Sequence, residues 1–314
     1  MPERLRVQLE ALESTEAGKT EQKTMDSESD NIFTYKAGFD WLCQRRCLLH
    51  GGMGVAVAAD GRGGVWRLGN GLSLETAQAL LAAHDENASK NQWLKKDLKR
   101  RLSLVEEGGA RYVVKEYLHV IRMSMFSPDQ RGWLCGNRLV GSVPVLGWYR
   151  DHSRGVLVMA CAGEQSLSLW KRTYDIGCMV PKYVRAGQLI AMLHQKNIYH
   201  ADLKPNNFVV VNAHDTSEDI VLIDCDDVRF PSRLPMKRRV KNLAQFFGGM
   251  GFAVTAVNDR RRLAEAAKQG YCNQMRMAGF LDESWHRPFN AYVREIYPDS
   301  FASYCEMEDV LWRS

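Results

Sequence analysis

Residues 200–207 read HADLKPNN. A short apolar segment and a polar turn follow, and residues 221–224 then read VLID. An amphipathic helix is predicted just before them, over Pro181–Lys196, because its apolar residues recur at helical spacing. Two short apolar strands, Phe208–Val211 and Ile220–Ile223, enclose a polar turn. Any one of the polar residues alone would be interpreted as part of a turn or as a strand-end cap. Helix, loop, strand, turn and strand in this order instead indicate one site that gathers Asp202, Asn207 and Asp224.

This pattern resembles the catalytic loop and metal-binding motif of the protein-kinase-like fold, H-x-D-L-K-x-x-N followed by an apolar strand that ends in Asp. The resemblance implies that Asp202 is the base that accepts or orients the acceptor hydroxyl proton, and that Lys204 steadies the transferring phosphoryl group. It also implies that Asn207 and Asp224 are ligands of Mg²⁺ and that ATP is the phosphoryl donor.

The expected fold class is therefore α+β, a protein-kinase-like bilobal fold with a small sheet-rich N-lobe and a larger helical C-lobe. We assign residues 1–31 to a flexible polar tail and residues 32–161 to the N-lobe with an N-terminal extension. Residues 162–314 form the expected helical C-lobe with the catalytic and metal-binding loops. Two hairpins are predicted in the N-lobe, at residues 53–68 and 101–115.

The resemblance requires a lysine on an upstream strand that reaches the nucleotide phosphates. Lys115 closes the strand YVVK, which resembles the V-A-I-K strand of protein kinases. The chain around Met159 and Cys161, at the end of a predicted strand, is the expected hinge that contacts the adenine. We therefore predict that Lys115, Met159 and Cys161 bind the nucleotide.

Two departures from protein kinases concern carboxylates. An acid on the helix after the lysine strand normally pairs with the lysine, and Asp129 is the only acid between Tyr117 and Tyr149. The pair is therefore either absent or made by Asp129. The second departure is DCD at residues 224–226, where Phe and Gly usually follow the first Asp. Its second carboxylate, like that of the next residue, Asp227, either lies near the metal or caps the following segment.

A third departure is the absence of a glycine-rich loop over the phosphates. The spacing from Ser73 to about Asp97 is helical, and a basic group surrounds its end, consisting of Lys95, Lys96, Lys99 and Arg100. These cations either cover phosphates by charge or line a solvated helix face. The two interpretations are about equally supported by the sequence.

Among kinase-like proteins, the chain resembles the bacterial lipopolysaccharide core kinases, which phosphorylate heptose or 3-deoxy-manno-octulosonic acid. HADL at residues 200–203 and LIDCD at residues 222–226 are similar to that group's H-A-D-L and L-I-D-F-D. Residues 237–247 resemble its R-x-K-D-L-x-x-L segment, with Asn242 where Asp is frequent. The resemblance covers about residues 94–270.

The basic stretch from Arg229 to Lys241 suits the acceptor that the resemblance implies. A core oligosaccharide on its lipid anchor carries carboxylates and phosphates and lies at an anionic membrane surface. We expect a nucleotide and an anionic glycolipid or sugar as partners, with peripheral contact at the inner face of the cytoplasmic membrane, and no nucleic acid. A solvated basic helix is the simpler alternative for this stretch.

Composition agrees with a cytoplasmic protein. Lys and Arg number 42 against 37 Asp and Glu, a net charge of +5, and eight cysteines are scattered without a zinc-binding spacing. The start, MPERLRVQLEALE, lacks the apolar core of a signal peptide.

Two other functions remain open from the sequence. A pseudokinase that serves as a regulatory binding module is favoured by the missing acidic partner and glycine-rich loop, and opposed by the joint presence of Asp202, Asn207 and Asp224. A kinase of a protein or of another small metabolite is the second alternative. Only 16 residues separate Asp224 from Lys241, which is short for a peptide-binding activation segment.

Overall fold

The computed structural model describes residues 54–61, 63–118, 127–139, 141–163, 165–170, 175–211, 220–275 and 283–298. All of them belong to the unit Leu42–Ser314. The tail predicted at residues 1–31 lies outside the described residues, as does the extension up to residue 53.

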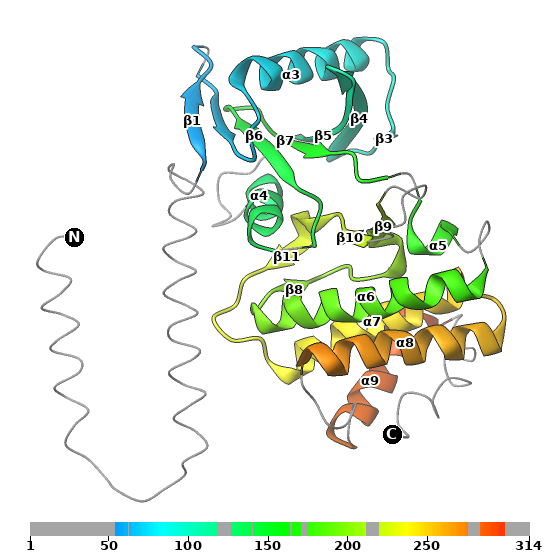
Figure 1. Cartoon of the computed structure of the whole chain (residues 1–314). Helices are drawn as coiled ribbons and strands as arrows, with labels where there is room; N and C mark the ends of the chain where they lie inside the picture. Colours follow the sequence, from blue (N-terminus) through cyan, green and yellow to red (C-terminus); the bar gives the residue numbers. More distant parts are fainter. Residues whose placement is uncertain are drawn as a thin grey trace, which may run out of the picture. The chain divides into compact units, whose positions relative to one another are not determined.

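A seven-stranded sheet forms the first part of the described chain, in the order β1-β2-β6-β7-β5-β4-β3 (Figure 1). Its neighbouring strands are all antiparallel, and they are β1 (Ala56–Ala59), β2 (Val65–Leu68), β3 (Lys95–Lys96), β4 (Arg100–Glu107), β5 (Ala110–Leu118), β6 (Val145–Arg150) and β7 (Arg154–Ala160). Both predicted hairpins are present, as β1–β2 and β4–β5. Gly108 and Gly109 join β4 to β5 with φ of 59° and 76°, left-handed values that a two-residue hairpin turn requires and glycine tolerates.

Alternate residues of the central strands face opposite sides of the sheet. Val114 of β5 and Val156 of β7 are buried in a cluster with Leu80 of α3 (Leu74–Ser89), the helix that covers one face. Lys115 and Leu157, their neighbours in sequence, line a cavity on the other face. The strand register therefore directs the Lys115 side chain away from α3 and into the cavity.

The helix expected from Ser73 to about Asp97 is shorter than its spacing predicted. The Ser73 hydroxyl caps α3 by accepting the Thr76 amide at 3.0 Å, and the helix ends at Ser89. Asn91 then adopts a φ of 54°, a left-handed conformation that ends the helical path. Lys95 and Lys96 consequently lie in strand β3 and not on a helix face.

The second part of the described chain is mainly helical. Its helices are α5 (Leu167–Trp170), α6 (Ile176–Gln195), α7 (Met236–Ala253), α8 (Val257–Met275) and α9 (Glu283–Ile296). Their apolar faces share one buried core, in which Phe246 of α7 lies against Tyr183 of α6. Figure 1 shows α6, α7 and α8 stacked beneath the short strands of this part.

Two glycines allow α6 and α8 to approach closely. A Cβ on Gly187 would lie 2.0 Å from the Ala267 carbonyl oxygen, and one on Gly270 would lie 1.9 Å from the Val184 carbonyl oxygen. The helix predicted from Pro181 begins earlier, at Ile176, because the Asp175 carboxylate accepts the Gly177 amide and caps it.

Short elements between the two parts carry most of the site residues predicted from the sequence. β8 (Tyr199–His200) pairs with β11 (Val228–Arg229), and β9 (Phe208–Val210) pairs with β10 (Ile220–Leu222). The 3₁₀ turns η1 (Pro205–Asn207) and η2 (Cys225–Asp227) adjoin them, and α4 (Pro128–Arg138) packs on η2. The expected α+β class, with a sheet-rich part followed by a helical part, is confirmed.

Candidate active site

The loop between β8 and β9 brings Asp202 and Asn207 together. The Asp202 amide donates to Nδ1 of His200 at 3.3 Å, and Nδ2 of Asn207 donates to the Asp202 carbonyl oxygen at 2.7 Å. The Ile223 amide donates to the Asn207 carbonyl oxygen at 2.8 Å, which joins the end of β10 to the same loop. Asp224 follows directly, so all three side chains predicted to act together lie at one end of the β9–β10 pair.

The backbone of Asp224 is strained. Its φ of 61° and ψ of 41° are left-handed, an uncommon conformation for a residue other than glycine. The Ala201 amide, which donates to the Asp227 carbonyl oxygen at 2.9 Å, ties the following turn to the catalytic loop. Strain that the surrounding structure sustains in this way is concentrated at functional sites in proteins.

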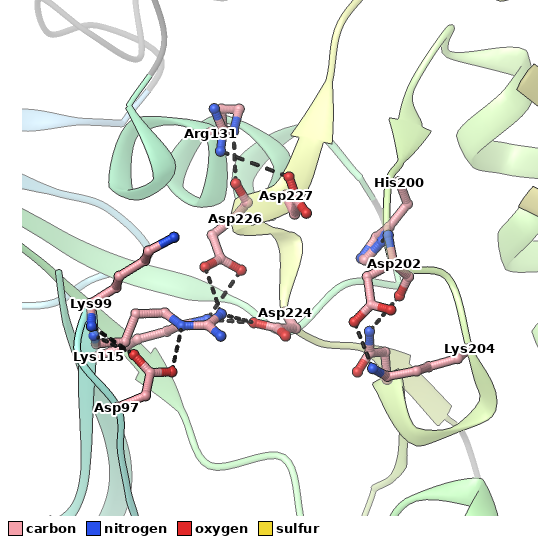
Figure 2. A network of polar contacts seen from close by, with 12 residues as sticks. Asp97, Lys99, Lys115, Arg131, His200, Asp202, Lys204, Asp224, Asp226 and Asp227 are labelled. Atoms are coloured by element: carbon pink, nitrogen blue, oxygen red, sulfur yellow. Dashed lines mark hydrogen bonds and ion pairs between the residues drawn. The ribbon is translucent and has the colours of Figure 1, made fainter. Parts of the chain in front are cut away.

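Asp202 and Lys204 form an ion pair at the open side of this loop. Lys204 Nζ lies 2.7 Å from Asp202 Oδ2, and the two side chains are 36% and 45% exposed (Figure 2). A carboxylate that is accessible to solvent and held by a lysine can meet an incoming hydroxyl group.

Lys115 contacts the carboxylate of Asp224, the residue that precedes η2, and that of Asp226 within η2. Its ammonium donates to Asp224 Oδ1 and lies 3.1 Å from Asp226 Oδ1 (Figure 2). Burial lowers the pKa of Lys115, but the two carboxylates outweigh burial and raise it above the ordinary value. Burial raises the pKa of Asp224, but Lys115 and Arg100 outweigh that effect and hold it well below its usual range. Both partners are therefore charged at neutral pH.

The alternative pairing of Lys115 with Asp129 is not observed. Asp129 is fully buried at the start of α4, and its Oδ2 accepts the indole N–H of Trp148 at 2.8 Å. On α4, Gly132 lines the cavity near η2 and has no side chain to offer. The acid beside Lys115 comes instead from the DCD segment, so the sequence-based search for it on the following helix looked in the wrong element.

A cavity of about 510 Å³ separates the sheet from these loops, and its polar lining includes Lys115, Asp202, Lys204, Asn207, Asp224 and Asp226. Its apolar lining suits an adenine ring and includes Leu102, Val113, Val145, Leu157, Met159, Val209 and Ile223. Met159 was predicted at this place. Cys161 does not line the cavity, whereas Ala160, Ala162 and Gly163 do; its amide donates to the Arg111 carbonyl oxygen at 3.0 Å.

The basic residues before β4 lie at the edge of the cavity. Lys95 and Arg100 line it, and Lys99 follows Asp97 in the turn that joins β3 to β4. Arg100 contacts the same two carboxylates as Lys115, with NH1 3.3 Å from Asp226 Oδ2 and 3.7 Å from Asp224 Oδ1. The interpretation of this group as a solvated helix face is wrong, because the chain here is a β-hairpin. The period-2 alternation that places Arg100 beside Leu102 on the cavity face could have identified it.

Asn242 anchors the catalytic loop, a role that the sequence did not reveal. Its Oδ1 accepts the His200 amide at 3.3 Å, and its Nδ2 donates to the His200 carbonyl oxygen. One turn later on α7, Gln245 Nε2 donates to the Ala201 carbonyl oxygen. Two neutral amides thus hold the two residues that directly precede Asp202, so no charge is needed at position 242.

The donor set fits Mg²⁺ bound together with a nucleotide. Asp224 presents a carboxylate that is 29% exposed, and Asn207 lies beside it. Mg²⁺ in phosphoryl-transfer sites takes few protein oxygens and completes its shell with phosphate and water. Within the described ranges, no cluster of three or more His, Cys, Asp and Glu side chains could hold a metal by itself. The residues therefore suit a metal that arrives with phosphate groups.

The basic stretch after η2 is divided between exposed and packed side chains. Arg229, Arg233 and Lys237 are exposed. Arg238 lies over the Tyr199 ring at 5.4 Å and Lys241 over the Tyr292 ring at 5.7 Å. In the part of the chain that the structure describes, no helix is both long enough and apolar enough to cross a bilayer.

A comparison with known protein families matches the part of the chain that carries this site. Residues 157–264, from β7 into α8, match the model of the Lipopolysaccharide kinase (Kdo/WaaP) family. Among solved structures the chain is similar to "WaaP in complex with acyl carrier protein", at 17% identity and a TM-score of 0.46, over 76% of this chain and 95% of that one. The family match spans the catalytic loop, η2 and α7. The chain thus resembles the lipopolysaccharide kinases over the segment that carries its candidate site, and it is a kinase, a phosphotransferase.

Proposed function

We propose that this protein transfers the γ-phosphoryl group of ATP to a sugar hydroxyl of an anionic acceptor that resembles the lipopolysaccharide core. The observation that carries the proposal is the convergence of Asp202, Asn207 and Asp224, joined by the two hydrogen bonds of Asn207 described above. The match to the lipopolysaccharide kinase family supports the acceptor class.

In this proposal the oxygen of the acceptor hydroxyl forms a bond to the γ-phosphorus, and Asp202 accepts the proton that this hydroxyl loses. The bond from that phosphorus to the β,γ-bridging oxygen breaks, and ADP leaves. Lys204, paired with Asp202 at 2.7 Å, orients the carboxylate and steadies the transferring group. Lys115 binds the nucleotide phosphates, and Met159 contacts the adenine together with its neighbours Ala160 and Ala162. Mg²⁺, held by Asn207 and Asp224, would neutralise developing charge on the phosphates.

The exposed part of the basic stretch supports an anionic acceptor at a membrane surface. Arg229, Arg233 and Lys237 extend from β11 to the start of α7 and adjoin the turn that is tied to Ala201. Their charges would attract acidic head groups and core phosphates without penetrating the bilayer. We propose a cytoplasmic enzyme that associates peripherally with the inner face of the cytoplasmic membrane.

An acceptor panel tests the proposal. The wild-type protein is incubated with γ-labelled ATP and Mg²⁺ and one of three acceptors: a lipid-linked core oligosaccharide, the same oligosaccharide without its phosphates, and an unrelated serine-rich peptide. We expect label on the sugar of the first acceptor, less on the second and none on the peptide. Labelling of the peptide with no labelling of either saccharide would overturn the acceptor class.

A further inference from the structure

Asp226 is more enclosed than the other carboxylates of the cavity. Its side chain is 6% exposed, against 29% for Asp224, and each of its carboxylate oxygens contacts a cation. Oδ1 lies 3.1 Å from Lys115 Nζ, and Oδ2 lies 3.3 Å from Arg100 NH1. Figure 2 shows this carboxylate directed at Lys115.

Helix α4 fixes the backbone that carries this carboxylate. Arg131 Nε donates to the Asp226 carbonyl oxygen at 2.7 Å. The next residue, Gly132, lies between η2 and β7: a Cβ there would be 3.9 Å from the Asp226 Cα, an ordinary contact distance, but would meet the Leu157 side chain of β7 at 2.6 Å. The helix therefore does not contribute an acid of its own. It holds in place an acid that comes from another element.

We propose that Asp226 is the positioning residue of the nucleotide-binding lysine, holding the Lys115 ammonium in the cavity beside Asp224. A lysine side chain has four flexible carbons, so a fixed anion is needed to keep its charge at one point. Asp226 suits this role because it is buried and its backbone carbonyl is hydrogen-bonded to α4. Its carboxylate faces Lys115, which lies on β5, and Arg100, which lies on β4. The inference rests on the proposed role of Lys115, and it assigns the second carboxylate of DCD to neither of the two roles that the sequence suggested.

The role can be separated from that of a metal ligand by measuring nucleotide binding without metal. In EDTA, Asp226→Asn should weaken ATP binding about tenfold, while Asp226→Glu, which keeps the charge, should recover part of the loss. The Mg²⁺ concentration for half-maximal transfer should stay unchanged. Asp227→Asn is the matched control, since Asp227 lies in the same turn with a side chain that is 60% exposed.

A double-mutant cycle tests whether Asp226 acts through Lys115. In a Lys115→Met background, Asp226→Asn should cause no further loss of metal-free ATP affinity. Because the buried Asp226 variant could fold poorly, Arg131→Met provides a second route: it releases the Asp226 carbonyl oxygen and should weaken metal-free ATP binding less than Asp226→Asn does. Thermal unfolding of each variant accompanies the binding measurement.

Two results would overturn the inference. One is unchanged metal-free affinity in Asp226→Asn with a raised Mg²⁺ requirement, which would make Asp226 a metal ligand. The other is a loss of metal-free ATP affinity on Asp226→Asn that is equally large in the wild-type and Lys115→Met backgrounds. Neither depends on the acceptor, so failure of the proposed sugar substrate would leave these binding results interpretable.

Discussion

The indole N–H of Trp148 donates to the buried carboxylate of Asp129 at 2.8 Å and connects β6 to the first turn of α4. This bond assigns a structural role to an acid that its position in the sequence made a candidate partner of Lys115. The carboxylate also lies against Gly155, where a Cβ would be 2.3 Å from Asp129 Oδ2.

Replacing Asp129 should therefore affect stability and not nucleotide binding. Asp129→Ala leaves the Trp148 indole without its acceptor, and we expect the free energy of unfolding to fall by about 1–3 kcal/mol. Asp129→Asn keeps an acceptor oxygen and should lose less. Denaturant titration and ATP titration of both variants check this, and a loss of ATP affinity as large as that of Lys115→Ala would restore Asp129 as the lysine partner.

The close crossing of α6 and α8 depends on Gly187 and Gly270. Gly270→Ala would place a methyl group against the Val184 carbonyl oxygen, which is backbone and cannot swing aside. We expect a loss of about 1–3 kcal/mol in unfolding free energy, as for other overpacked interiors. Gln188→Ala, beside the crossing on α6, is the control. An unchanged melting temperature in Gly270→Ala would show that the helices can separate at little cost.

A buried histidine gives the protein an acid-sensitive core. His194 contacts the Tyr271 hydroxyl at 2.9 Å, and burial, followed by the charge of Arg239, lowers its pKa from 6.5 to about 3. The unfolded chain takes up this proton below about pH 6.5 and the folded chain does not, so its contribution to stability decreases as the pH falls.

From pH 7.5 to pH 5 this one group should remove about 2 kcal/mol of unfolding free energy. The His194→Gln variant has no group that titrates at this position, so its free energy of unfolding should decrease by correspondingly less over the same pH interval. Urea titrations of both proteins at the two pH values measure the difference. Parallel pH dependence in the two proteins would mean that the pKa of His194 is the same in the folded and unfolded chains.

Salt should distinguish an acceptor-binding basic stretch from a merely solvated one. Replacing Arg229, Arg233 and Lys237 together by Ala should weaken sedimentation with vesicles rich in anionic lipid and raise KM for a lipid-linked anionic acceptor. Wild-type binding should decrease as salt screens charges beyond about 8–10 Å. Metal-free ATP affinity should stay constant, because none of the three side chains lines the nucleotide cavity. Vesicle binding that is unchanged both by added salt and by the triple substitution would contradict a role of these residues in acceptor binding.

The sequence predicted what is encoded locally. The order of apolar strands around HADLKPNN placed Asp202, Asn207 and Asp224 together, and the resemblance of YVVK to the V-A-I-K strand singled out Lys115, which lines the cavity. The turn residues Gly108 and Gly109 located the β4–β5 hairpin. These features follow from the spacing of a few residues and need no knowledge of what packs on them.

What the sequence did not show depends on contacts between distant segments. Asp226 lies 111 residues beyond Lys115, and the packing of η2 on α4, with the Arg131 side chain bound to the Asp226 carbonyl oxygen, holds it there. Asn242 meets His200 because α7 crosses beneath the catalytic loop. Cys161 was expected in the nucleotide site, but its amide is already bonded to Arg111 across the sheet, so the cavity wall there is made by the residues on either side of it.

The central claim is that Asp202 is the base of a phosphoryl-transfer site, and single-turnover transfer by Asp202→Asn tests it most directly. The variant keeps the size of the side chain and should bind ATP as the wild type does. Transfer of labelled phosphate from ATP to the lipid-linked saccharide should fall about 10²–10⁴-fold, the usual contribution of a general base. Asp227→Asn, measured beside it, should transfer at close to the wild-type rate. Near-wild-type transfer by Asp202→Asn, with ATP bound normally, would contradict the account.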